Sequence, residues 1–374
     1  MRHILFVTGT RADFGKLEPL ALAARAAGFR VGFFVTGMHM LDRYGLTKLE
    51  VRRLPGVEIA EFLNQRQGDP QDMIFAKTVI GFSDFVRETL PDLIVVHGDR
   101  VEAMATAFVA ATNHIRCAHV EGGEVSGTID EVFRHCNTKL ATLHLVSSEA
   151  ARDRVLAMGE DAAAVAVIGS PELDSHARPS GVTLDEVRAR YAIPFDDYGI
   201  VAFHSVTSEL DSIGAQAEAL FGALEVSGRC FVVIHPNNDP GCEAIQRVID
   251  RLPAARFRSL PSMRFAWFSE LLRNAACLVG NSSAGVREAP FLGIPSLDIG
   301  TRQTNRGGGP SLVSASAFDG AAIAGFLADR WGRRHPRDTR FGEGDAARAF
   351  ADLLASPTVW SLPLQKRFHD PQPR

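Results

Sequence analysis

Short apolar runs rich in β-branched residues alternate along the chain with longer segments whose apolar positions recur at helical spacing. In the first half we expect a helix over about 16–27 and strands over 3–7, 31–35, 94–96, 119–120 and 143–146. In the second half we expect helical segments between strands over 199–203, 231–234, 257–260, 277–279 and 296–299. Such alternation is typical of α/β proteins, in which helices cover both faces of a parallel sheet.

The length of the chain indicates more than one domain, because 374 residues exceed what a single hydrophobic core usually supports. The proline-bearing stretch from Pro171 to Tyr198 has little periodicity and is the expected linker. We therefore expect two α/β halves of similar size with a cleft between them. The final segment, 357–368, is expected to pack across the surface.

Composition and charge narrow the class of partner. A formal net charge of −4 gives no broad cationic field for nucleic acid or anionic lipid. No apolar stretch reaches the roughly 18 residues of a membrane helix, and the first residues are strand-like rather than those of a signal peptide. The five cysteines include no CxxC pair, which argues against disulfides and a zinc site. These patterns predict a cytoplasmic protein that binds a small molecule rather than nucleic acid or a membrane.

Two acidic residues follow neighbouring predicted strands. Asp99 comes after the apolar run 93–96, and about twenty residues later Glu121 follows 118–120, a spacing that fits one βαβ unit. In open parallel sheets the ligand crevice lies at the carboxyl ends of the strands. Acids in these positions therefore indicate an enzyme.

A second pair of acids, Asp130 and Glu131, opens the next predicted helix. Thr128 and Glu131 fit a capping box, so Glu131 has a structural explanation. Asp130 has no such explanation, and it follows a glycine-bearing loop that could fold it back over Glu121. Crowded carboxylates differ in how strongly they hold a proton, which suits one to donate a proton while another removes one.

Residues 7–16 join the first predicted strand to the first helix, where free N–H groups favour a phosphate. Arg11 and Lys16 would add positive charge. A plain helix start, with Thr10 and Asp13 forming a capping box, explains the segment equally well. The segment is not GxGxxG and no acid ends the second strand, so a dinucleotide cofactor is disfavoured.

The second half has a similar segment at 280–288. Its small residues let the backbone approach an anion, and Ser282 and Ser283 supply hydroxyl donors. Glu288 could accept both hydroxyls of a ribose, although an exposed helical glutamate is the commoner explanation for such a residue taken alone.

His204 and His235 end successive predicted strands of the second half, so both could face the cleft. A single histidine is more often structural, and two at successive strand ends make a functional role more attractive. The histidines show no metal-ligand spacing, so a metal is not expected.

Several segments, in the right order along nearly the whole chain, resemble the UDP-N-acetylglucosamine 2-epimerases. They are residues 7–13, 98–100, 119–124, 129–131, 203–204, 235–238 and 280–290. Details within 119–131, 280–283 and 299–303 are similar to the hydrolysing branch, which feeds sialic acid and related nonulosonic acid synthesis. The non-hydrolysing branch typically has Asp-Ser-Gly-Gly where this chain has 281–284.

The resemblance implies the glycosyltransferase-B architecture, with two Rossmann-like domains and an inter-domain cleft. The expected domains are 1–175, 195–355 and a C-terminal helix in 356–374 that packs back on the first domain. It also implies a reaction without metal or cofactor. The C2 proton is removed and UDP leaves by anti elimination, giving 2-acetamidoglucal; water then adds to release N-acetylmannosamine. Relatives are often homodimers.

Site residues follow from the same resemblance. Acid/base steps are assigned to Asp99, Glu121 and Asp130, with Glu131 as an alternative to Asp130 and His204 near the sugar or phosphate. The residue that removes the C2 proton stays open. Residues assigned to the nucleotide are Arg11, Ser282 and Ser283 at the diphosphate, Lys16 less securely, His235 beside it, Asn281 in the same segment, and Glu288 at the ribose.

Alternatives stay open. The substrate could be UDP-2,4-diacetamido-2,4,6-trideoxyglucose, as in legionaminic acid pathways, or a GDP-linked equivalent. The chain could also be a non-hydrolysing epimerase, a glycosyltransferase of the same fold, or a non-enzymatic nucleotide-sugar sensor. The last two leave the three carboxylates unexplained.

Overall fold

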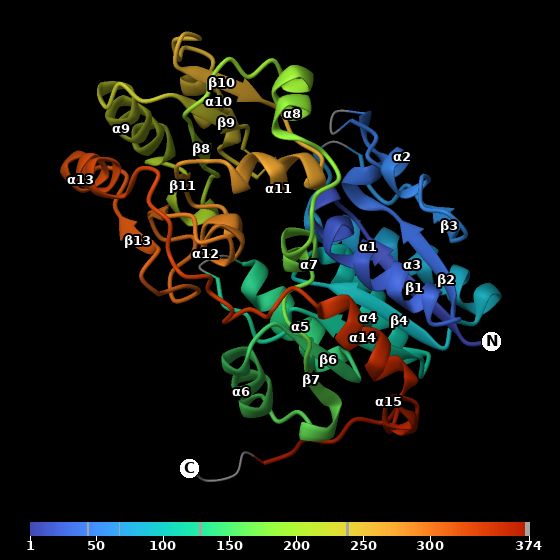
Figure 1. Ribbon diagram of the computed structural model, residues 1–374. Coiled ribbons are helices and arrows are strands. Elements are labelled where there is room, and N and C mark those ends of the chain that lie inside the picture. The colour runs from blue at the N-terminus through green and yellow to red at the C-terminus, as the bar shows by residue number, and fades with distance from the viewer. Residues whose placement is uncertain (43–44, 67, 127–128, 237–238, 371–374) are drawn as a thin grey trace. The chain divides into compact units, whose positions relative to one another are not determined.

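The structure is a computed structural model. The described residues are 1–42, 45–66, 68–126, 129–236 and 239–370. The chain forms two compact units (Figure 1). Unit 1 contains Met1–Glu124, Ile129–Asp174 and Phe341–Arg374, and unit 2 contains Val125–Thr128 and Ser175–Arg340.

Unit 1 is built on a parallel sheet whose described strands lie in the order β3-β2-β1-β4-β5-β6-β7. These are β1 (His3–Thr8), β2 (Arg30–Val35), β3 (Glu58–Glu61), β4 (Leu93–His97), β5 (Arg116–Val120), β6 (Leu143–Val146) and β7 (Val165–Val167). The helices of this unit are α1 (Arg11–Ala26), α2 (Lys48–Val51), α3 (Gln71–Thr89), α4 (Val101–Thr112), α5 (Asp130–Leu140), α6 (Glu149–Ala157), α14 (Ala346–Ala355) and α15 (Pro357–Ser361). A further short helix, α7 (Glu172–Ala177), begins in unit 1 and ends in unit 2.

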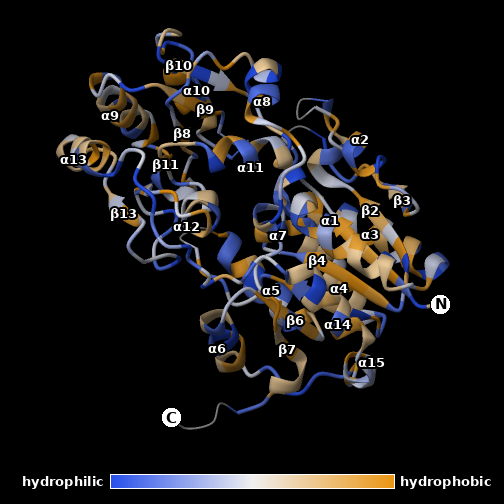
Figure 2. Cartoon of the chain, viewed as in Figure 1, coloured by the Kyte–Doolittle hydropathy of each residue, from blue (hydrophilic) through white to orange (hydrophobic). Residues whose placement is uncertain are grey.

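Both faces of the first sheet are buried, as the apolar runs predict. Along β1, Ile4 and Phe6 belong to one hydrophobic cluster, whereas Leu5 and Val7 belong to another. Successive side chains of a strand point to opposite faces, so each cluster occupies one side of the sheet. Figure 2 shows β4 coloured as hydrophobic, in keeping with a central strand covered on both sides.

Unit 2 is built on a second parallel sheet, with the described strands in the order β10-β9-β8-β11-β12-β13. These are β8 (Gly199–Ala202), β9 (Phe231–Ile234), β10 (Phe257–Leu260), β11 (Leu278–Gly280), β12 (Ser296–Ile299) and β13 (Leu312–Ala315). The helices are α8 (Leu184–Tyr191), α9 (Ile213–Val226), α10 (Cys242–Ile249), α11 (Phe265–Arg273), α12 (Glu288–Phe291) and α13 (Gly320–Arg330).

In each unit the first strand lies between the second and the fourth, as in Rossmann-like sheets. The switch in strand order falls between β1 and β4 in unit 1, and between β8 and β11 in unit 2. Doubly wound sheets bind ligands beyond the carboxyl ends of the strands at this switch point. The loops that follow β1, β4, β8 and β11 are therefore the places to look for a site.

Three strands were not predicted: β3, β7 and β13. All three lie at sheet edges, where one side of the strand is left uncovered. Their residues are mostly half-buried rather than buried, which removes the continuous apolar run on which the predictions depend.

The end of the second unit also differs from the expected boundary, because 341–355 belongs to unit 1. Figure 1 shows α14, in red, beside the first sheet and its helix α1. Phe350 and Leu354 of α14 are buried in the same cluster as Ile4. Asp174 accepts hydrogen bonds from the N–H groups of Ala346 and Ala347, both at 2.8 Å, and so anchors the start of α14.

Candidate active site

Asp99 lies in the turn after β4, and neighbouring elements fix this turn. The Gly98 carbonyl accepts hydrogen bonds from His119 Nε2 at 2.7 Å and from Asn137 Nδ2 at 2.9 Å. Because a carbonyl only accepts, His119 carries its proton on Nε2. Burial lowers the pKa of His119 to about 3, so the ring is neutral. The buried Arg134 guanidinium pairs with the Asp99 carboxylate.

Glu121 follows β5, which pairs in parallel with β4, so Glu121 and Asp99 both lie at the carboxyl ends of the strands. Its φ of +64° places it in the left-handed region, which is uncommon for a residue with a side chain. Such strain of about 1–3 kcal/mol is concentrated at functional sites. Gly123, at φ +74°, must be glycine because a Cβ there would lie 2.2 Å from the Ala151 carbonyl oxygen.

The Glu121 carboxylate is 6% exposed and accepts hydrogen bonds from Lys16 and Ser170. Lys16 Nζ lies 3.1 and 3.2 Å from its two oxygens, and Ser170 Oγ lies 2.9 Å from Oε1. His97 Nε2 lies 3.2 Å from Oε2. A second buried acid, Glu172 at the start of α7, lies 3.4 Å from Lys16 Nζ and 2.7 Å from Ser170 Oγ. The structure thus pairs Lys16, which was expected less securely at the diphosphate, with Glu121 and Glu172.

Asp130 and Glu131 form the first turn of α5. Glu131 Oε1 lies 3.4 Å from His135 Nε2, one turn further along the helix. Thr128, with which Glu131 was expected to form a capping box, lies outside the described residues, as do Asn237 and Asn238 of the motif after His235.

The loop after β1 is a helix cap, one of the two interpretations left open. Thr10 Oγ1 accepts from the Asp13 N–H at 3.2 Å, and the Asp13 carboxylate accepts from the N–H groups of Thr10 and Gly9, both at 3.0 Å. These two N–H groups therefore already hold an anion, supplied by the chain itself. Arg11 pairs with Glu50.

In unit 2 the ends of β8 and β11 are joined by Asn281. Its Oδ1 accepts from the His204 N–H at 2.7 Å and its Nδ2 donates to the His204 carbonyl at 2.8 Å. The preceding Gly280, at φ +136°, leaves no room for a side chain, because a Cβ would lie 2.1 Å from the Ala202 carbonyl oxygen. Asn281 is 1% exposed, so its amide positions the loop. Burial and the nearby Arg302 charge lower the pKa of His204 to about 3, so this imidazole is neutral.

Ser282 and Ser283 follow Asn281 and are partly exposed. Ser282 Oγ accepts from the Ala284 N–H at 3.4 Å, at the start of a single 3₁₀ turn. His235 follows β9, and burial lowers its pKa. Its Nε2 is buried and has no hydrogen-bond partner among the described residues.

Glu288 is the first residue of α12, and it is not an exposed helical glutamate. It is 7% exposed, and its Oε1 lies 3.2 Å from His176 Nε2. His176 Nδ1 in turn lies 2.8 Å from Ser269 Oγ. A carboxylate held in this way is prepared to accept hydrogen bonds in one fixed direction.

The sequence also carries a family signature. The family model of the UDP-N-acetylglucosamine 2-epimerases matches residues 21–355. The chain belongs to this family. It is 41% identical over 379 residues to the UDP-N-acetylglucosamine 2-epimerase of Neisseria meningitidis, covering 99% of both chains.

Two other similar proteins illustrate the range of the family. A UDP-N,N'-diacetylbacillosamine 2-epimerase (hydrolyzing) of Legionella pneumophila is 28% identical over 373 residues, covering 98% of this chain and 99% of the relative. The crystal structure of the Methanocaldococcus jannaschii UDP-GlcNAc 2-epimerase in complex with UDP-GlcNAc and UDP has a TM-score of 0.80 at 18% identity, covering 95% of this chain and 99% of that one. The glycosyltransferase-B-like fold is therefore confirmed. None of the described helices is long and apolar enough to cross a bilayer.

The sequence did not single out several residues that lie against the candidate residues or their partners: His97, Arg134, Ser170, Glu172, His176 and Ser269. His97 ends a predicted strand next to Asp99, so its position was a usable signal. Ser170, Glu172 and His176 lie in or near the expected linker, where no periodicity indicates which side chains turn inward.

Proposed function

We propose that the chain is a hydrolysing UDP-N-acetylglucosamine 2-epimerase, which converts UDP-N-acetylglucosamine and water to N-acetylmannosamine and UDP. The observation that carries this proposal is the buried Glu121 carboxylate, which lies next to Lys16, Ser170 and His97. Like Asp99, it follows the carboxyl end of a central strand. Removal of a weakly acidic C–H proton needs a fixed carboxylate in a site with little water.

The reaction we propose has two steps. A base removes the C2 proton as the C1–O bond to UDP breaks, giving 2-acetamidoglucal. Water then adds its oxygen to C1 while an acid returns a proton to C2, so the net change consumes one water and releases UDP. We assign these proton transfers to Asp99, Glu121 and Asp130, with Glu131 as the alternative to Asp130.

The nucleotide part of the site is assigned to unit 2 together with Arg11. Glu288, oriented by His176, is proposed to accept the ribose hydroxyls, and Ser282 and Ser283 to donate to the diphosphate. His235 has a buried nitrogen available for a phosphate oxygen. His204 is proposed to lie near the sugar or phosphate, and Asn281 to hold the loop that carries Ser282.

The hydrolysing outcome is favoured by the Legionella relative, whose name specifies hydrolysis and whose whole length this chain covers. The same relative supports a second candidate substrate, a UDP-linked 2,4-diacetamido sugar. We further propose a role in sialic or related nonulosonic acid synthesis, a cytoplasmic location and a homodimer.

Product analysis tests the proposal. Purified protein is incubated with UDP-N-acetylglucosamine or with UDP-2,4-diacetamido-2,4,6-trideoxyglucose, and products are followed by NMR. We expect free N-acetylmannosamine and UDP in equal amounts from the first. A UDP-linked epimer without free sugar would indicate the non-hydrolysing reaction, and turnover of only the second substrate would reassign the sugar. In the matched variants Asp99→Asn and Glu121→Gln, we expect a loss of at least roughly 100-fold in rate with UDP binding retained.

A further inference from the structure

One hydroxyl lies between two buried carboxyl groups in unit 1. Ser170 Oγ lies 2.9 Å from Glu121 Oε1 and 2.7 Å from Glu172 Oε2, both within the range of an O–H···O hydrogen bond. A serine hydroxyl has one proton and so donates only once. For both contacts to be hydrogen bonds, one of the two carboxyl groups must carry a proton and donate it to Ser170.

The surroundings of the two acids differ, and the difference indicates where that proton is held. Lys16 Nζ, on α1, lies 3.1 and 3.2 Å from the two Glu121 oxygens, and His97 Nε2, at the end of β4, lies 3.2 Å from Oε2. Glu172 has one longer contact with Lys16, at 3.4 Å, and the two acids are similarly buried, at 4% exposed for Glu121 and 2% for Glu172. A nearby positive charge favours the ionised carboxylate. The two shorter contacts of Glu121 with the Lys16 ammonium group therefore point to Glu121 as the carboxylate and to Glu172 as the holder of the proton.

We propose that Glu172 is a protonated positioning residue that acts on Glu121 through Ser170. The Glu172 carboxyl donates to Ser170 Oγ, and the Ser170 hydroxyl donates to Glu121 Oε1. This arrangement holds the Glu121 carboxylate in one orientation and keeps a proton next to it. The kinetic part of this inference rests on the proposed role of Glu121; the location of the proton does not.

The same chain of hydrogen bonds can move the proton without any other reactant. The Glu172 O–H bond breaks as its proton passes to Ser170 Oγ, while the proton of Ser170 passes to Glu121 Oε1. The negative charge moves from Glu121 to Glu172, and the hydroxyl is regenerated. Glu121 thereby gains the proton that an acid must give to C2, and the reverse shift restores its carboxylate.

Infrared spectroscopy of the substrate-free protein tests where the proton is held. We expect the carbonyl stretch of a protonated carboxyl group at neutral pH, sensitive to heavy water, which disappears in Glu172→Gln. The band should persist in the double variant Lys16→Met/Glu121→Gln, which removes the Glu121 carboxylate together with the cation that would otherwise ionise Glu172. A band that survives in Glu172→Gln, or one that the double variant abolishes, overturns the proposal.

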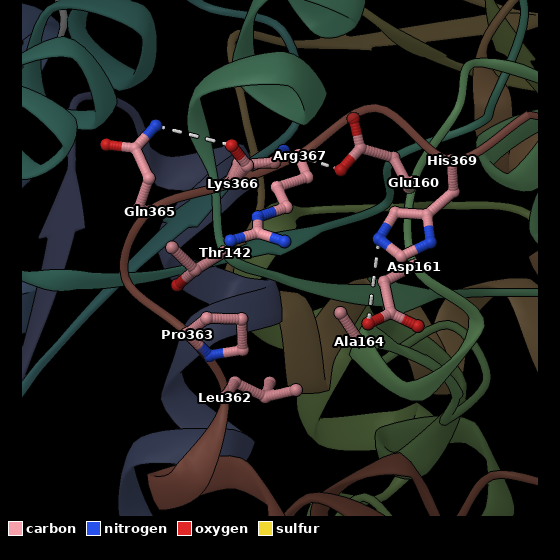
Figure 3. Close-up of a pocket in the computed structure, with 10 residues that line it drawn as sticks. All are labelled: Thr142, Glu160, Asp161, Ala164, Leu362, Pro363, Gln365, Lys366, Arg367 and His369. Carbon is pink, nitrogen blue, oxygen red and sulfur yellow. Dashed lines mark hydrogen bonds and ion pairs between the residues drawn. The ribbon is translucent and has the colours of Figure 1, made fainter.

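A buried but ionised glutamate provides the matched control. Glu160 is 3% exposed and lies in a cavity of about 300 Å³ under the C-terminal segment, where Figure 3 shows it beside Lys366. Although burial opposes ionisation, hydrogen bonds from His144, Lys139 and Lys366 lower the pKa of Glu160 to about 2. The variant Glu160→Gln should therefore leave the carboxyl band unchanged.

Kinetics test the positioning role. A glutamine at 172 offers an N–H to Ser170 at every pH, whereas the glutamate does so only while protonated. In Glu172→Gln we therefore expect the alkaline limb of the kcat profile to move to higher pH, with KM changing less than kcat. Ser170→Ala, which removes the donor to Glu121, should lower kcat by roughly 10- to 100-fold. An unmoved alkaline limb in Glu172→Gln contradicts the role.

The two measurements separate this inference from the proposed function. A protein that shows the Glu172 band but no epimerase activity contradicts the proposed function alone, and an active epimerase without the band contradicts this inference alone. If Glu172→Gln does not fold, Ser170→Ala replaces it in the infrared experiment. Its Glu172 band should shift in frequency because the acceptor is lost, and an unshifted band overturns the proposal.

Discussion

Replacing Lys16 by methionine should strongly destabilise unit 1. Lys16 keeps most of its aliphatic volume in this change but loses the charge that lies between the Glu121 and Glu172 carboxyl groups. The side chains of the three residues are 16%, 6% and 3% exposed, in the order Lys16, Glu121 and Glu172, so water cannot replace the ammonium group. Removing one partner of a buried ion pair typically costs about 3–5 kcal/mol, and we expect a value in this range.

Urea denaturation at neutral pH, followed by circular dichroism, measures this loss. Lys48→Met is the matched control, because the Lys48 partner Glu61 keeps a second cation, Arg52. Because Glu61 stays paired with the half-exposed Arg52, the control should cost at most about 1 kcal/mol. Adding Glu121→Gln to Lys16→Met should recover part of the lost stability, because one uncompensated charge is removed. Equal losses in Lys16→Met and Lys48→Met would refute the reasoning.

Three further predictions concern other parts of the molecule. In thermal melts, Gly280→Ala should destabilise unit 2 by more than the roughly 1–3 kcal/mol of a strained backbone conformation, because its Cβ would lie 2.1 Å from the Ala202 carbonyl oxygen. The control Gly222→Ala should not destabilise unit 2, because a Cβ at Gly222 would have no neighbouring atom within 4 Å. Measured by calorimetry, Glu288→Ala should weaken UDP binding roughly 10- to 100-fold. The binding of 2′,3′-dideoxyuridine diphosphate, which lacks the ribose hydroxyls, should be unchanged. An equal loss for both ligands would show that Glu288 does not bind the ribose. Because the pKa of Glu160 is lowered from 4.5 to about 2, its ionised form stabilises the fold above pH 4.5, and this stability is lost as the pH falls towards 2. When the melting temperature is measured against pH, Glu160→Gln should lack this part of the loss in acid. An unaltered pH dependence would contradict the prediction.

The sequence predicted the central strands and the edge strand β10, but missed the edge strands β3, β7 and β13 for one physical reason. Runs such as 93–96 are buried on both faces and stay apolar without interruption, whereas β3 and β13 are partly uncovered and mix polar with apolar residues. The position of Asp99 and Glu121 at the carboxyl ends of their strands followed from the apolar runs that precede them and from the βαβ spacing between them.

Other parts of the site depend on contacts that no local pattern encodes. Ser170 contacts Glu121 across about fifty residues of sequence, and His176 contacts Glu288 across more than a hundred. The number of N–H groups left for a phosphate after β1 depends on where the Asp13 side chain points. Such outcomes follow from side-chain packing, not from periodicity.

The most direct test of the central claim is the origin of the hydrogen at C2 of the product. Turnover of UDP-N-acetylglucosamine in heavy water should give N-acetylmannosamine with one deuterium at C2, and Glu121→Gln should slow its formation by at least roughly 100-fold. A product that keeps the original C2 hydrogen, or a Glu121→Gln variant with normal turnover, would contradict the account.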